Sequence, residues 1–161
     1  GNFDMAKSEL AILNQLRDEL LRQKDSYKSR EVEIQIKTGE AWIQFESANK
    51  NDALRTMKLA ADMEDSTEKH PVTPGEVLPA RELLGDMLLQ LKQNTEALQA
   101  YESVLQKSPN RFNSLYGAGL GAEKLGNKQK TVFYFKQLLS IVDTAKSDRP
   151  EVATARSFMK L

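Results

Sequence analysis

Apolar and small residues recur every three or four positions along most of the chain, which is the spacing of one face of a helix. Between residues 25 and 49 this stripe predicts one long helix, in which Gly39 is a weak point. Residues 2–24 predict a helix before it. The positions expected to face inward are Phe3, Leu10, Leu13, Leu16 and Leu20 in the first helix, and Ile34, Thr38, Ala41, Phe45 and Ala48 in the second.

The second half of the chain repeats its own pattern. The stretch that begins at Leu78 can be laid over the stretch that begins at Phe112, so that Gly85 falls on Gly119. A helix–turn–helix period of about 34 residues is that of tetratricopeptide repeats (TPRs). The other matched pairs are Leu84 with Ala118, Leu91 with Leu125, Leu98 with Val132, Tyr101 with Phe135, Val104 with Leu138 and Leu105 with Leu139.

The first of these blocks resembles the TPR consensus at nearly every position, and the second departs from it twice. Thr131 stands where the consensus has alanine, and we expect its extra bulk to loosen the contact between the two helices. Asp143 stands where a closing proline is expected. The resemblance implies an all-α fold, a right-handed superhelical stack of antiparallel helix hairpins with about seven helices. It rests on Leu84, Gly85, Leu88, Ala97, Tyr101, Val104 and Pro109, and on Gly119, Gly126, Phe135 and Leu138.

We expect one TPR-like domain over residues 1–161. Its start resembles the turn that opens a second TPR helix, so we expect residues 1–161 to begin midway through a repeat, as a fragment of a longer array would. At the other end, Asp148 is expected to cap the last helix, with Glu151 placed for a capping-box contact. The expected parts are a partial repeat helix (2–24), a divergent repeat (25–65), a Pro/Gly loop (66–77), two repeats (78–111 and 112–145) and a capping helix (148–161).

Residues 40–158 also resemble a bacterial TPR family of unassigned function, chiefly through the stretches 62–65, 69–75 and 78–85. Proteins of this kind are often longer and exported, so the likeness implies a soluble, exported or periplasmic protein. It brings no activity with it.

Charge and composition exclude several classes of function. Lysine plus arginine equals aspartate plus glutamate, 23 each, so no net field favours nucleic acid or an anionic membrane. The chain has no cysteine, which excludes disulfides and thiolate metal sites. It has no apolar run long enough for membrane insertion.

The residue inventory also argues against an enzyme. His70 is the only histidine, which is too few for a zinc site or a cysteine–histidine pair, and no nucleophile motif lies near it. The glycines from Gly117 to Gly121 lack the lysine of a phosphate-binding loop, and we interpret them as helix-packing positions. We therefore expect no catalytic residues, no cofactor and no metal.

Trp42, the sole tryptophan, has two interpretations. If the turn before Ala53 is one residue shorter than in the later repeats, Trp42 matches Gly85 and faces the seam between helices. Otherwise it could anchor a ligand in a groove. We favour the core position, because large aromatic side chains are mostly buried.

By resemblance, the first helices of successive repeats line a concave groove. Acidic Glu82 and Asp86 stand where carboxylate-binding TPR domains carry lysine, arginine or asparagine, so we expect a basic or apolar protein segment as partner. The predicted function is a non-catalytic interaction scaffold. The alternative is a structural segment packed within a longer array or a homo-oligomer. The candidate groove residues are Glu82, Asp86, Leu89, Gln90, Asn113, Tyr116, Leu120, Glu123 and Lys124.

Overall fold

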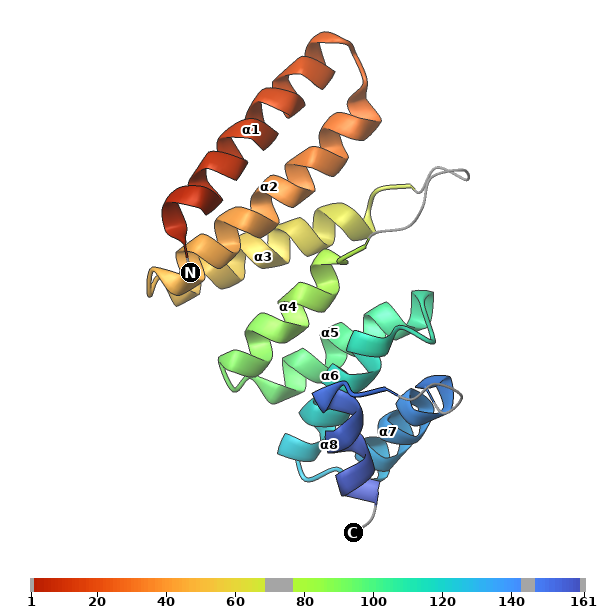
Figure 1. The fold of residues 1–161 in the computed structure, drawn as a ribbon. Coiled ribbons are helices and arrows are strands. Elements are labelled where there is room, and N and C mark those ends of the chain that lie inside the picture. The colour runs from red at the N-terminus through yellow and green to blue at the C-terminus, as the bar shows by residue number, and fades with distance from the viewer. Residues whose placement is uncertain (1, 69–76, 143–146, 160–161) are drawn as a thin grey trace. The chain divides into compact units, whose positions relative to one another are not determined.

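The computed structural model describes residues 2–68, 77–142 and 147–159, and it confirms the all-α fold (Figure 1). These residues form eight helices rather than about seven. The chain divides into two compact units, residues 1–84 and 85–161, and the division falls within α4. The helices are α1 (Phe3–Arg22), α2 (Ser26–Glu46), α3 (Lys50–Asp65), α4 (Ala80–Gln90), α5 (Asn94–Lys107), α6 (Phe112–Lys124), α7 (Lys128–Val142) and α8 (Pro150–Met159). His70, Pro71, Pro74, Gly75 and Asp143 lie outside the described residues.

The turns within the hairpins have one common geometry. Ala48, Lys92 and Gly126 each precede the next helix with a positive φ, of 63°, 60° and 70° respectively. In each turn, the following backbone N–H reaches back to the last turn of the helix, as when Asn127 N–H donates to the carbonyl of Ala122 at 2.9 Å. This is the Schellman arrangement, in which a left-handed residue ends a helix. The hairpins α2/α3, α4/α5 and α6/α7 therefore turn over the same number of residues.

The glycine predicted to sit at each interhelical seam does so in both C-terminal hairpins. A Cβ atom on Gly85 would lie 2.8 Å from Cε1 of Tyr101, and one on Gly119 would lie 2.6 Å from Cδ1 of Phe135. Both rings are fully buried. Gly117 contacts the opposite side of Tyr101, so the ring of α5 fills the space between α4 and α6. The repeat register is thereby confirmed.

In the N-terminal unit, α2 packs against both α1 and α3 (Figure 1). Arg17 of α1 donates to Glu33 of α2 at 2.8 Å, and Lys37 lies 3.2 Å from the same carboxylate. The prediction for α1 was wrong in part. Phe3 and Leu16, expected to face inward, are 37% and 45% exposed, because α1 is covered by α2 alone among the described helices.

The start of α4 is held by acidic side chains of α3. Glu64 accepts a hydrogen bond from the backbone N–H of Ala80 at 2.7 Å, which satisfies one of the free donors at a helix N-terminus. Arg81 pairs with Asp62 and Asp65, each at 2.6 Å. The pKa of Arg81 is raised, since these two carboxylates outweigh the lowering effect of its burial. Three carboxylates of one helix thus fix the beginning of the next.

Trp42 does not occupy the seam. Because the turn before α3 has the same length as the later turns, Ala41 and not Trp42 is the equivalent of Gly85. Ala41 is fully buried, whereas Trp42 is half-buried and meets Phe45 edge-on, with ring centroids 5.6 Å apart. The condition on which the core assignment rested was wrong.

Two further expectations change at the C-terminal end. Thr131 is fully buried, and its hydroxyl donates to the carbonyl of Asn127 at 2.8 Å, so the seam accommodates it without an unsatisfied polar group. The last helix begins at Pro150, and Glu151 binds the side chain of Arg149 at 3.4 Å. Proline suits this first helical position, which needs no N–H donor. The residue directly before the helix is therefore Arg149 and not the expected cap, Asp148.

Candidate functional site

The predicted groove residues fall on α4 and α6, and the structure buries one of them. Glu82 is only 1% exposed and belongs to the N-terminal unit, so it is not available as a groove residue. The other eight lie in the C-terminal unit. Four of them are half-buried: Asp86, Leu89, Tyr116 and Leu120. The other four are exposed: Gln90, Asn113, Glu123 and Lys124.

Tyr101 joins the two helices that carry these residues. Its ring lies between Gly85 of α4 and Gly117 of α6. Its hydroxyl donates to the carboxylate of Asp86 at 2.6 Å, which fixes that side chain beside the seam. Asp86 is therefore an oriented acceptor on the surface of α4, held by a buried residue of α5.

The apolar part of this surface is centred on α6. Gly117 and Gly119 turn inward, and Tyr116 and Leu120, which flank them, stay partly accessible. Tyr116 is supported from below by Phe135, with ring centroids 6.2 Å apart. We call Asp86, Leu89, Gln90, Tyr116 and Leu120 the α4/α6 surface. It combines one fixed carboxylate with three large, partly accessible apolar side chains.

The N-terminal end of α6 is engaged by the segment before α8. The guanidinium of Arg149 lies 4.0 Å from the ring centroid of Phe112 and donates to the side-chain oxygen of Asn113 at 3.4 Å. Asn113 therefore has an intramolecular partner. At the other end of α6, Glu123 and Lys124 are exposed neighbours of opposite charge.

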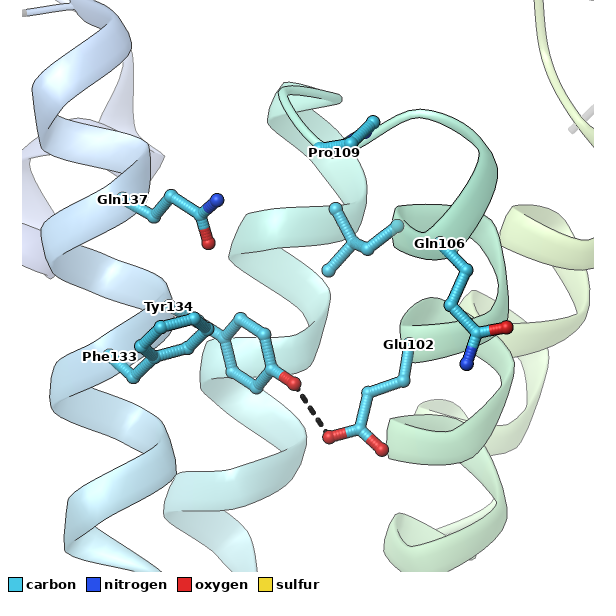
Figure 2. A pocket seen from close by; sticks show the side chains of 7 residues that line it. Glu102, Gln106, Pro109, Phe133, Tyr134 and Gln137 are labelled. Carbon is cyan, nitrogen blue, oxygen red and sulfur yellow. Dashed lines mark hydrogen bonds between the residues drawn. The ribbon is translucent and has the colours of Figure 1, made fainter.

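A pocket of about 330 Å³ opens between α5 and α7, the second helices of the two C-terminal hairpins (Figure 2). Tyr134 and Lys130 of α7 both bind one oxygen of Glu102 on α5, each at 2.6 Å. Phe133 meets Tyr134 edge-on at 5.1 Å and is 58% exposed. The lining residues are Glu102, Leu105, Gln106, Pro109, Phe133, Tyr134 and Gln137.

The charged and polar groups of this pocket bind one another and hold α7 against α5. Burial, followed by the hydrogen bond and charge of Glu102, raises the pKa of Tyr134 well above its ordinary value. Lys130 neutralises Glu102, so the wall carries no net charge. A pocket at the small end of the range for ligand sites, with one paired carboxylate, can take a single apolar side chain but offers no free acid–base pair.

Over the described residues, no three histidine, cysteine, aspartate or glutamate side chains come together to hold a metal ion. In the same part of the chain, no helix has both the length and the apolar character needed to cross a bilayer.

Sequence reasoning missed the pairing of Glu102 with Tyr134 and Lys130. These residues lie on second helices of successive repeats, far apart in sequence, and each looks like an ordinary surface residue of an amphipathic helix. The one available signal was Phe133, an aromatic residue on the polar side of its helix.

Solved structures with the same fold include a tetratricopeptide repeat protein from Parabacteroides merdae ATCC 43184, with a TM-score of 0.64 and 15% identity. That match covers 95% of this chain and 59% of the other, so the chain spans less than two thirds of its length. MamA (41-end) from Desulfovibrio magneticus RS-1 has a TM-score of 0.58 and 12% identity, over 94% of this chain and 91% of that one.

A MamA RS-1 ArsTM double mutant has a TM-score of 0.56 and 13% identity, over 94% of this chain and 90% of that one. No family model matches the sequence, and no curated protein matches it. At these identities the similarity shows the TPR-like fold alone.

Proposed function

We propose that the chain is a non-catalytic protein-interaction scaffold that binds a segment of another protein on the α4/α6 surface. The observation that carries this proposal is the position of Tyr116 and Leu120. They remain accessible on a helix whose other face is packed tightly by Gly117 and Gly119. Large apolar side chains held rigidly at a surface are typical anchors for a partner.

The charges of the surface indicate what kind of segment fits. Asp86 is an anionic acceptor held by Tyr101, and Glu123 is exposed farther along α6. Complementary charge favours a segment that is apolar with a basic residue, in an extended or helical form. A partner's terminal carboxylate would meet Asp86 and be repelled.

The alternative is a structural segment whose α4/α6 surface is covered within a longer array or a homo-oligomer. The contacts of Arg149 with Phe112 and Asn113 favour this structural role, because they show that an adjacent segment already covers the beginning of α6. The two functions differ in what touches Tyr116 and Leu120.

Affinity capture from source cells with matched variants tests the proposal. Leu89→Ala, Tyr116→Ala and Leu120→Ala should each weaken the capture of the same protein while leaving the unfolding temperature almost unchanged. Phe133→Ala is the matched control, because Phe133 is an exposed aromatic residue on α7, outside the α4/α6 surface. It should leave capture intact.

Light scattering on the purified chain distinguishes the interaction scaffold from the structural segment. A stable oligomer that Tyr116→Ala dissociates would show that copies of the chain cover the surface. A large loss of stability on Leu120→Ala would show that the surface is internal packing. Equal loss of capture in the Phe133→Ala control would also count against the α4/α6 surface.

A further inference from the structure

The pocket between α5 and α7 has an exposed aromatic side chain in its wall. Phe133 is 58% exposed, although phenylalanine is among the residues most often buried in proteins. Its ring meets Tyr134 edge-on at 5.1 Å, and Tyr134 is itself fixed by its hydrogen bond to Glu102 (Figure 2). Phe133 is therefore a large apolar side chain held in a defined position at the surface, as an anchor point for a partner would be.

Two carboxamide side chains line the same pocket, Gln137 from α7 and Gln106 from α5 (Figure 2). Within the described parts of the chain, neither side-chain amide has a hydrogen-bond partner. A carboxamide both donates and accepts, so it matches the N–H and C=O groups of a peptide backbone. The polar groups of the pocket therefore favour a polypeptide segment over an apolar small molecule.

The helix face that carries Phe133 is basic. The sequence of α7 contains three lysines, Lys128, Lys130 and Lys136, and no acidic residue. Lys130 and Lys136 lie three residues before and after Phe133, so they share its side of the helix. Lys130 neutralises Glu102, whereas Lys136 is exposed and forms no ion pair with the described residues. The remaining positive charge favours an acidic partner.

We propose that the pocket between α5 and α7 binds an acidic segment of another protein, which places one large apolar side chain against Phe133. The backbone of this segment bonds to the amides of Gln106 and Gln137, and its carboxylates lie beside Lys136. The volume of about 330 Å³ suits a single side chain.

This binding site goes beyond the proposed function. It lies on the second helices of the hairpins, whereas the α4/α6 surface lies on first helices. The two surfaces also prefer opposite charges, because Asp86 favours a basic segment and Lys136 an acidic one. They therefore take different segments, and either proposal can fail without the other.

An NMR titration with two short capped peptides tests the proposal. The first peptide has one phenylalanine flanked by glutamates, and the second has the same phenylalanine flanked by lysines. The glutamate peptide should shift the side-chain amide signals of Gln106 and Gln137 and the backbone amide signal of Phe133. It should bind about tenfold more tightly than the lysine peptide.

Four exposed residues provide variants and matched controls that leave the fold intact. Phe133→Ala should weaken binding of the glutamate peptide about tenfold, because it removes the apolar contact. Leu59→Ala, at a position of α3 that is 49% exposed, should leave binding unchanged. Lys136→Glu should weaken binding severalfold, whereas Lys58→Glu, which makes the same charge change on α3, should not.

Four results would overturn the proposal. One is the absence of shifts at Gln106 and Gln137 with the glutamate peptide at millimolar concentration. Another is equal binding of the glutamate and lysine peptides. The third is binding to phosphatidylserine vesicles that Phe133→Ala abolishes and the glutamate peptide does not inhibit, because a membrane surface is then the occupant. The fourth is a dimer, seen by light scattering, that Phe133→Ala dissociates, because a second copy of the chain then fills the pocket.

Discussion

Gly119 lies so close to the ring of Phe135 that a Cβ atom at this position would stand 2.6 Å from Cδ1. Phe135 is fully buried and has no room to withdraw. We expect Gly119→Ala to lower the free energy of unfolding by about 1–3 kcal/mol, because overpacking a seam costs more than the added helix propensity returns. Chemical denaturation with urea measures this change.

Gly121 provides the control on the same helix. A Cβ atom there would lie 3.4 Å from Cβ of Leu98, which is an ordinary contact. Gly121→Ala should therefore be neutral or raise stability by up to about 1 kcal/mol, through helix propensity alone. Equal destabilisation by both substitutions would contradict the assignment of Gly119 to the seam.

The turns at Ala48 and Gly126 have the same backbone geometry but carry different residues. Exchanging alanine and glycine at these two positions should therefore change the free energy of unfolding in opposite directions. Ala48 has a φ of 63° without the freedom of glycine, so Ala48→Gly should raise the free energy of unfolding by roughly 0.5–1 kcal/mol. Gly126 has a φ of 70° and open space around it, so Gly126→Ala should lower it by a similar amount through conformation alone. Thermal unfolding of both variants tests the pair, and changes of the same sign would refute it.

Tyr134 should make the protein sensitive to alkali. The pKa of Tyr134 is raised in the folded state, so its contribution to stability is present below the ordinary tyrosine pKa of 10.0 and is lost as the pH rises beyond it. Tyr134→Phe should remove that part of the alkaline slope and cost about 0.5–1.5 kcal/mol at neutral pH for the lost hydrogen bond. Unfolding measured from pH 8 upward checks both effects.

Glu102→Gln tests the cause of that pKa. Without the anionic acceptor, Tyr134 should ionise at lower pH than in the wild type, which ultraviolet titration of the phenolate would detect. An unchanged titration would show that burial alone raises the pKa.

Glu33 should contribute to stability on the acid side. Its burial raises its pKa, but the hydrogen bonds and charges of Arg17 and Lys37 lower it by more, so the pKa lies below the ordinary glutamate value of 4.5. The stability from Glu33 is therefore present above that value and is lost as the pH falls through the lower folded-state pKa. Glu33→Gln should flatten the acid slope of the unfolding temperature.

The dependence of the unfolding temperature on salt concentration independently checks the contribution of Glu33 to stability. The side chains of Arg17 and Glu33 are 26% and 24% exposed, so added salt should weaken the pair only in part. If the acid slope is the same in Glu33→Gln and wild type at low salt, the contribution of this cluster to stability is refuted.

The sequence by itself determined the repeat and its register. One repeat period separates Gly85 from Gly119, and the same period separates Tyr101 from Phe135. In each hairpin the glycine leaves room for the aromatic ring where the two helices approach each other. The packing of a glycine against an aromatic ring involves residues of a single hairpin, so it can be inferred from their spacing in the sequence. The all-α class followed from the same pattern.

Tertiary structure alone decided which side chains are covered. Leu16 has the same apolar character as the buried leucines but is exposed, because burial depends on whether a neighbouring helix is present. Trp42 was misplaced because a shift of one residue turns a helical side chain by about 100°. Glu102 and Tyr134 meet because α5 and α7 line the same pocket, and such a contact between distant segments leaves no periodic trace in the sequence.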